Sequence, residues 1–279
     1  MANAKVIYNT LVNNISLPES GEEIGALAFA VLQNLGVSKT DILAEREISF
    51  DAAQLESITQ RLNNHEPLQY IFQEAWFYGR KFFVDNRVLI PRPETELLID
   101  IVKKNFKPTD SFSLLDIGTG SGCIAVTLAL EFPLAKVLAT DVSPAALQVA
   151  RKNADSLQAS VNFIENNIMH GLATESQLDL IVSNPPYIAH SEKQTMLPNV
   201  LRHEPHLALF ADANDPLIFY RAISKTALGI LSSHGIIAVE INEKMASEVI
   251  QIFEAGGFTR PKARTDLFGK ERVITALKA

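Results

Sequence analysis

Four consecutive residues, Asn184-Pro185-Pro186-Tyr187, follow an apolar run at 178–182 and combine the groups needed to hold a planar nitrogen. Each proline lacks a backbone N–H, so the loop presents carbonyl acceptors without competing donors. Proline also forces the preceding Asn184 into an extended conformation. We therefore expect two rigid acceptors, the Asn184 side-chain oxygen and the Pro185 carbonyl, which can hold both hydrogens of an –NH2 group. Tyr187 is expected to add a flat apolar wall beside that group.

An amino or amide nitrogen held in this way is a poor nucleophile, because its lone pair is delocalised. Two acceptors that tighten as charge develops on the nitrogen stabilise the transition state for its alkylation. Asn184 and Pro185 are therefore the predicted catalytic residues, and Pro186 and Tyr187 complete the predicted substrate-binding set. This chemistry requires no metal and no covalent intermediate.

A second motif, Gly118-Thr119-Gly120-Ser121-Gly122, lies between an apolar run at 114–117 and a helical pattern at 123–130. Glycines at a strand-to-helix junction allow a tight turn and a close approach to a ligand, and the helix N-terminus offers free N–H groups. A dinucleotide site places its third glycine one residue later, where this chain has Cys123. The spacing suits S-adenosyl-L-methionine, which carries a carboxylate and no pyrophosphate.

A carboxylate, Asp141, ends the next apolar run at 137–140, about 20 residues after the glycines, where a cofactor ribose is expected. In this place it can accept hydrogen bonds from both ribose hydroxyls. Asp116, two residues before the glycine loop, can order that loop instead of touching the ligand.

Strand and helix patterns alternate from Ser113 onward and would carry these motifs at one edge of a sheet. The alternation predicts a parallel sheet covered on both faces, with its ligands at the carboxyl ends of the strands. The predicted strands are 114–117, 137–140, 161–164, 178–182 and 236–241, and the predicted helices are 123–130, 217–231 and 244–255. Residues 262–265 and 273–277 are expected to close the sheet as an antiparallel pair.

The first part of the chain has a different pattern. Residues 1–72 show apolar positions at helical spacing and predict a short helical bundle without a chemical residue set. Residues 73–90 are aromatic and β-branched around Gly79 and predict a β-hairpin linker. The remaining residues, 91–279, form the predicted catalytic domain.

Composition limits the possible partners and the compartment. The 279 residues carry a net charge of −7, which disfavours a protein that grips bare nucleic acid and favours a small-molecule or protein partner. The single cysteine, Cys123, excludes an intrachain disulfide and fits the cytoplasm. We expect no signal peptide and no membrane span. His203 and His206 enclose a proline and lack helical i, i+4 spacing, so no metal site is predicted.

Taken together, these residues resemble the HemK/PrmC family, bacterial enzymes that methylate the glutamine amide of peptide-chain release factors. The match covers essentially the whole chain, and its most specific stretch is VLIPRPETE at 88–96. The other stretches are 68–71, 77–79, the glycine loop, NPPYI at 184–188, 204–205 and 266–272.

The resemblance implies a class I S-adenosylmethionine-dependent methyltransferase, with a Rossmann-like, seven-stranded, mostly parallel sheet. It implies that 1–72 dock the release factor, that 118–122 and Asp141 bind the cofactor, and that 184–187 bind the glutamine of a Gly-Gly-Gln motif. Asn184 is also expected to contact the cofactor, and the enzyme is expected to act as a monomer.

Three further positions follow from the resemblance. Asn167 and Ile168 stand near the expected adenine site, where the family tends to have an acidic residue followed by an aromatic one. Gln73 stands where the family usually has glycine. The stretch 92–94 lies near the active site without an assigned chemical step.

Two other functions share some of these features. An N-methyltransferase of exocyclic base amines also uses the glycine loop and NPPY, but predicts a basic face and a base-flipping pocket. A cofactor-binding scaffold without turnover would not need the two preorganised acceptors at 184–187. The first alternative is disfavoured by the acidic balance, and the second by the intact motif.

Overall fold

The computed structural model describes residues 1–174, 177–213 and 215–279, which form two compact units. The helical unit contains Met1–Gln73 and Leu197–His203, and the sheet unit contains Glu74–Met196 and Glu204–Ala279. Among the described residues, no helix is both long enough and apolar enough to cross a membrane.

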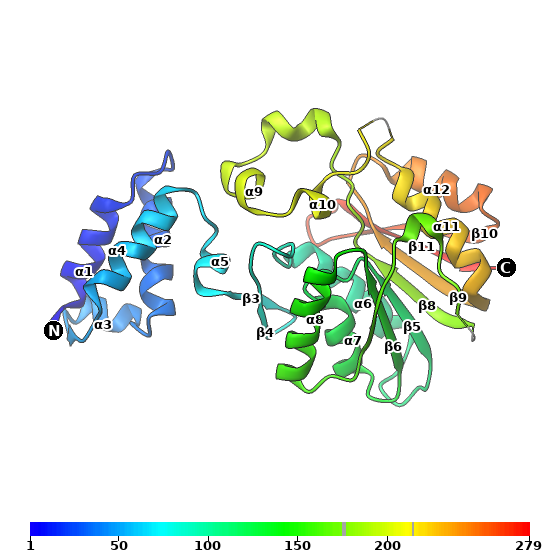
Figure 1. The fold of residues 1–279 in the computed structure, drawn as a ribbon, viewed down its shortest axis with the longest axis horizontal. Helices are drawn as coiled ribbons and strands as arrows, with labels where there is room; N and C mark the ends of the chain where they lie inside the picture. Colours follow the sequence, from blue (N-terminus) through cyan, green and yellow to red (C-terminus); the bar gives the residue numbers. More distant parts are fainter. Residues whose placement is uncertain (175–176, 214) are drawn as a thin grey trace. The chain divides into compact units, whose positions relative to one another are not determined.

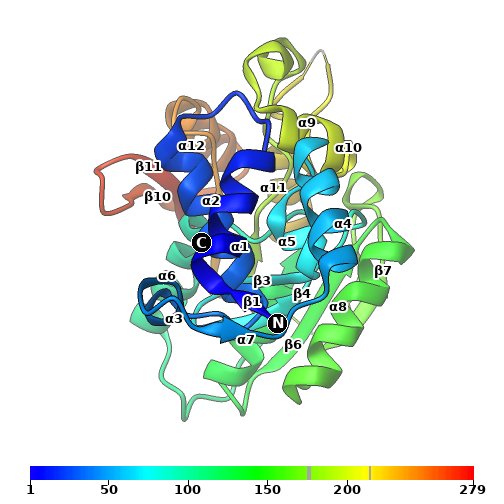
Figure 2. The ribbon, with the colours of Figure 1, turned by 90° about the vertical axis from the view of Figure 1, so that its left-hand side faces the viewer.

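The helical unit is built around α1 and α2, which pack against each other (Figure 2). Its helices are α1 (Ala4–Asn14), α2 (Gly21–Asn34), α3 (Lys39–Leu43), α4 (Ala52–Asn63), α5 (Leu68–Phe72) and α9 (Pro198–His203), and its strands are β1 (Ala2–Asn3) and β2 (Glu47–Ile48). Asp51 caps α4 by accepting from the backbone N–H groups of Ala53 and Gln54. The short β1–β2 pair and the inclusion of α9 were not predicted.

The sheet unit begins with a hairpin of β3 (Glu74–Phe77) and β4 (Arg80–Phe83). Tyr78 and Gly79 form its turn with positive φ values of 49° and 72°. The strand pairing ends at Phe83, earlier than the predicted hairpin. A turn that begins at Asp85 ends the hairpin. The Asp85 carboxylate accepts from the Arg87 N–H, and the Asp85 carbonyl accepts from the Val88 N–H.

The main sheet has seven strands in the order β10-β11-β9-β8-β5-β6-β7 (Figure 1). These are β5 (Ser113–Ile117), β6 (Lys136–Asp141), β7 (Asn162–Glu165), β8 (Leu178–Ser183), β9 (Leu231–Glu240), β10 (Phe258–Thr265) and β11 (Glu271–Lys278). The five strands from β9 to β7 run parallel, and β11 pairs antiparallel with both β9 and β10. The predicted α/β class, with a mostly parallel sheet and an antiparallel closing pair, is confirmed.

Helices cover both faces of this sheet (Figure 1). They are α6 (Glu96–Asn105), α7 (Cys123–Glu131) and α8 (Pro144–Leu157) on one face, and α11 (Ile218–Ile230) and α12 (Ala246–Ala255) on the other. Leu114 of β5 belongs to the core under the first group, whereas the next residue, Leu115, belongs to the core under the second. Successive strand residues point to opposite faces, so apolar residues continue through the strand.

Candidate active site

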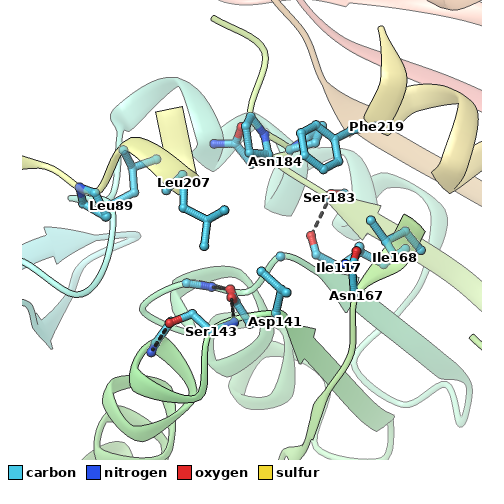
Figure 3. Close-up of a pocket in the computed structure, with 18 of the residues that line it drawn as sticks. Leu89, Ile117, Asp141, Ser143, Asn167, Ile168, Ser183, Asn184, Leu207 and Phe219 are labelled. Carbon is cyan, nitrogen blue, oxygen red and sulfur yellow. Dashed lines mark hydrogen bonds between the residues drawn. The ribbon is translucent and has the colours of Figure 1, made fainter. Parts of the chain in front are cut away.

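The carboxyl ends of β5, β6 and β8 meet at one edge of the sheet, where a cavity of about 300 Å³ opens. This volume lies within the range of small-molecule sites. Figure 3 shows Asn184 and Phe219 across the cavity from Asp141 and Ser143, with Leu207 and Ile168 on the remaining sides. All of these residues belong to the sheet unit.

The glycine loop connects β5 to α7 and forms one wall of the cavity. Gly118, Gly120 and Gly122 have φ values of 73°, 55° and 82°, a region that residues with a Cβ rarely adopt. Gly118 and Gly120 line the cavity, and a Cβ built on either meets no protein atom within 4 Å. A Cβ on Gly122 would lie 3.1 Å from the Ala150 Cβ, so this glycine allows α7 to pack against α8.

Asp141 joins the glycine loop to the start of α8. Its Oδ2 accepts from the Gly120 N–H and its Oδ1 accepts from the Ser143 N–H, both at 2.9 Å. Burial raises the pKa of Asp141, and the backbone hydrogen bonds from Ser143 and Gly120 oppose this rise. Each carboxylate oxygen retains a free lone pair, so the group can still accept from two ligand hydroxyls.

Asp116 lies behind the glycine loop instead of on the cavity wall. Its Oδ2 accepts from the Thr119 hydroxyl at 2.7 Å. Burial raises the pKa of this carboxyl to about 7, and the Thr119 hydrogen bond acts in the opposite direction. Asp116 therefore holds the loop in shape.

The segment after β7 supplies another wall, through Asn167 and Ile168. The Asn167 Oδ1 accepts from the Met169 N–H at 3.0 Å and caps a short turn, Ile168–His170. The Asn167 –NH2 group is left as the donor that this side chain can offer to a ligand. Ile168 contributes an apolar surface suited to one face of a ring.

The NPPY loop closes the cavity opposite Asp141. The Asn184 Nδ2 donates to the Thr95 hydroxyl at 3.1 Å, so the amide oxygen is the atom left to accept from a substrate. Pro185 and Pro186 line the cavity. The Tyr187 hydroxyl donates to Glu240 Oε1 at 3.1 Å, and its ring packs against the core formed with α11 and α12.

The predicted site residues therefore divide into two groups. Those on the cavity wall are Gly118, Gly120, Asp141, Asn167, Ile168, Asn184, Pro185 and Pro186. Those packed behind the wall are Thr119, Ser121, Gly122 and Tyr187. Leu207 and Phe219 line the cavity but were not predicted, because a single apolar side chain carries no distinguishing pattern in the sequence.

Arg92 and Glu204 form an ion pair that accounts for two motif residues without an earlier role. Glu204 is 4% exposed, and its carboxylate accepts from Arg92 Nη2 at 2.5 Å and from the Ile90 N–H at 3.2 Å. This pair fastens the loop before α6 to the segment that contains the cavity residue Pro205. Throughout 1–174, 177–213 and 215–279, no cluster of three metal-ligating side chains is present.

The cavity fits S-adenosylmethionine in chemistry as well as in size. Gly118 and Gly120 leave room for a ligand close to the backbone. Asp141 offers acceptors for ribose hydroxyls, and Ile168 offers an apolar face for a ring. Asn184 lies across the cavity from Asp141, with its amide nitrogen already bonded to Thr95.

Comparisons with known proteins show which family and fold this chain resembles. The Methyltransferase small domain family model matches residues 93–212. A crystal structure of a methyltransferase from Pyrococcus furiosus aligns with a TM-score of 0.53 at 19% identity, over 73% of this chain and 91% of its own, which supports the fold.

Curated relatives are more specific. A release factor glutamine methyltransferase of Flavobacterium psychrophilum is 40% identical over 260 residues, 91% of each chain. One from Bacteroides thetaiotaomicron is 43% identical over 261 residues, 91% of this chain and 93% of its own. This chain belongs to the release factor glutamine methyltransferase family.

Proposed function

We propose that this protein transfers a methyl group from S-adenosylmethionine to the side-chain amide nitrogen of the glutamine in the Gly-Gly-Gln motif of peptide-chain release factors. The observation that carries the proposal is the orientation of Asn184. Its nitrogen is bonded to Thr95, at the rim of a cavity whose opposite wall is formed by the glycine loop and Asp141. Its oxygen is thus available to an incoming –NH2 group.

Asp141, Gly118 and Gly120 hold the cofactor, and Asn167 and Ile168 contact its base. Bound S-adenosylmethionine supplies an electrophilic methyl group on a sulfonium. The residues around it provide alignment, and a well-oriented pair of reactants gains about 7–11 kcal/mol over free encounter.

The Asn184 oxygen and the Pro185 carbonyl accept the two hydrogens of the glutamine –NH2 group. Positive charge develops on this nitrogen as it bonds to the methyl carbon and the methyl–sulfur bond breaks, and the nitrogen then loses one of its two protons to water. Both hydrogen bonds strengthen at that stage, so they stabilise the transition state more than the bound substrate. Pro186 supports the loop because it has no N–H that could compete with these acceptors.

Asn184→Ala tests this function directly. The variant loses one of the two acceptors, so we expect the rate of methylation to fall about 100-fold or more, with little change in cofactor affinity. The assay follows transfer of label from radiolabelled S-adenosylmethionine to a purified release factor. A release factor with alanine in place of the Gly-Gly-Gln glutamine is the acceptor control, and Asn105→Ala, at an exposed end of α6, is the enzyme control.

Label on the normal factor and none on the altered factor supports the proposal. Equal labelling of both factors would rule out the glutamine as acceptor. Label on RNA or DNA, with none on either factor, would assign the protein to the base-methylating class.

We further propose that the helical unit docks the release factor, as the family resemblance implies. The cavity residues all belong to the sheet unit, so the helical unit is free for recognition of the protein substrate. We place the reaction in the cytoplasm, which agrees with the single, buried Cys123.

A further inference from the structure

The Asn184 amide can turn by 180° with almost no change in shape, but one orientation alone suits the proposed function. With its oxygen toward the cavity it accepts a hydrogen from the substrate –NH2 group. With its nitrogen toward the cavity, two donors face each other. The side chains that set the orientation of the Asn184 amide are therefore part of the active site.

The Thr95 hydroxyl is the partner that Asn184 has in the structure, and Thr95 is 2% exposed. A hydroxyl can both donate and accept, so it could bond either end of the amide. Thr95 by itself does not decide which end of Asn184 faces the cavity.

Glu240 removes this ambiguity. The Thr95 hydroxyl is close enough to the Glu240 carboxyl to lower its pKa. This carboxyl is 2% exposed and, when ionised, can only accept. While Glu240 is ionised, the Thr95 proton points to the carboxylate, and the Thr95 oxygen can then only accept from Asn184. The Asn184 nitrogen is then directed to Thr95, and its oxygen to the cavity.

The fold brings these groups together from distant parts of the chain. Glu240 is the last residue of β9, and its neighbour Val239 pairs with Ser183, the last residue of β8. Asn184 follows directly. Glu240 Oε1 accepts from Tyr187, so this carboxyl contacts the last residue of the NPPY motif directly.

The second carboxyl oxygen of Glu240, Oε2, favours the orientation in which the Thr95 proton points to the carboxyl group. Glu240 Oε2 is buried and has no hydrogen-bond partner within the described part of the chain. A buried acceptor without a partner is costly, so it gains from any nearby donor that can turn toward it. The Thr95 hydroxyl is such a donor.

We propose that Thr95 and Glu240 are positioning residues that set the orientation of the Asn184 amide, with Glu240 acting by taking up the Thr95 proton. The inference rests on the proposed function, in which the Asn184 oxygen holds the glutamine –NH2 group. Thr95, near the end of the VLIPRPETE stretch, thereby has a role in the reaction without contacting the substrate.

Thr95→Val is the first test, because valine keeps the shape of threonine and loses the hydroxyl. At pH 8, above the pKa of about 7 that burial gives Glu240, we expect kcat for the release factor to fall at least about tenfold. The affinity for S-adenosylmethionine, measured by calorimetry, should be unchanged. Thr95→Ser, which restores a hydroxyl, should recover most of the rate.

Thr127→Val is the matched control. Thr127 is fully buried in α7, and its hydroxyl makes no hydrogen bond with the described residues. Replacing an unpaired buried hydroxyl with a methyl group should leave kcat unchanged and stability equal or higher.

A signal that does not depend on turnover separates positioning from a general structural role. In protein labelled with ¹⁵N-asparagine, the side-chain –NH2 signals that disappear in Asn184→Ala identify Asn184. We expect these signals to shift and exchange faster with water in Thr95→Val, and to stay in place in Thr127→Val. A folded Thr95→Val protein with unchanged signals and near wild-type kcat overturns the inference.

Glu240→Gln provides the same test if Thr95→Val does not fold. Glutamine has an acceptor oxygen in place of one carboxylate oxygen and an –NH2 donor in place of the other. It therefore cannot keep the acceptor for Tyr187 at Oε1 and also offer an acceptor to Thr95 at Oε2. The expected result is again a lower kcat with altered Asn184 signals, and unchanged kcat and signals overturn the inference. The proposed function is tested separately: it fails if Asn184→Ala retains full activity. If Asn184→Ala is inactive while Thr95→Val and Glu240→Gln are fully active, the proposed function stands and the positioning inference fails.

Discussion

Glu240 is a carboxyl group held almost completely out of water, and this has a consequence for stability. Burial raises its pKa from 4.5 to about 7. The hydroxyls of Thr95 and Tyr187 and the charge of Arg272 oppose this rise, whereas Glu94 adds to it. The folded protein thus keeps a proton on Glu240 at pH values where the unfolded chain has released it.

We predict that Glu240→Gln becomes more stable relative to the wild type as the pH rises. The favourable contribution of protonated Glu240 is complete below pH 4.5 and is lost as the pH rises through about 7. A pKa difference of this size corresponds to about 3 kcal/mol in the free energy of unfolding. Glutamine does not titrate, so the difference between the two proteins should move by about 2–3 kcal/mol from pH 5 to pH 8.

Urea unfolding at both pH values measures this difference. Glu248→Gln, at an exposed position of α12, is the control, and its difference from the wild type should stay nearly constant. An equal free-energy difference for Glu240→Gln at pH 5 and pH 8 would mean that Glu240 titrates in its ordinary range.

The end of α5 has a backbone conformation that favours glycine, although the residue there is Gln73. Gln73 follows the helix in the left-handed conformation, with φ of 55°, and its N–H donates to the Gln69 carbonyl. This conformation favours glycine, because a Cβ is crowded there. The glycine expected from the family at this position therefore has a backbone reason.

We predict that Gln73→Gly raises the free energy of unfolding by about 0.5–1 kcal/mol, since it relieves a backbone conformation disfavoured by a Cβ. Gln60→Gly, in the interior of α4, is the matched control and should lower stability by a similar amount, because glycine is a poor residue for a right-handed helix. Thermal unfolding of both variants measures whether each substitution raises or lowers the free energy of unfolding. A loss of stability in Gln73→Gly would show that its side chain matters more than its backbone angle.

Single elements can be predicted from one sequence, but contacts between distant elements cannot. The apolar run at 178–182 predicted β8 and the position of the NPPY loop, because burial on both faces leaves a continuous hydrophobic signal. Thr95 lies 89 residues from its partner Asn184, and Glu240 lies 53 residues from Tyr187. A single hydroxyl or carboxyl shows no periodicity, so pairings over such separations become visible only when the sheet brings strand ends together.

At the scale of the whole molecule, one short segment is placed differently from its neighbours in the sequence. Leu197–His203 belongs to the helical unit, whereas the residues before and after it belong to the sheet unit. The ring nitrogen Nε2 of His203 lies 2.9 Å from the Asn64 carbonyl oxygen within the helical unit. The next residue, Glu204, pairs with Arg92 in the sheet unit. The chain thus returns to the helical unit between the NPPY loop and the cavity residue Pro205.

Deletion of residues 1–73 tests whether the helical unit serves recognition of the release factor. The cavity residues lie outside this segment, so we expect S-adenosylmethionine to raise the melting temperature of the shortened protein. If the helical unit docks the factor, kcat/KM for the intact factor should fall by two orders of magnitude or more, on the order of a lost protein interface. A short Gly-Gly-Gln peptide makes no use of docking, so its kcat/KM should change little. Equal losses for both acceptors would instead mean that the deletion damages the active site, and undiminished methylation of the intact factor would place docking on the sheet unit.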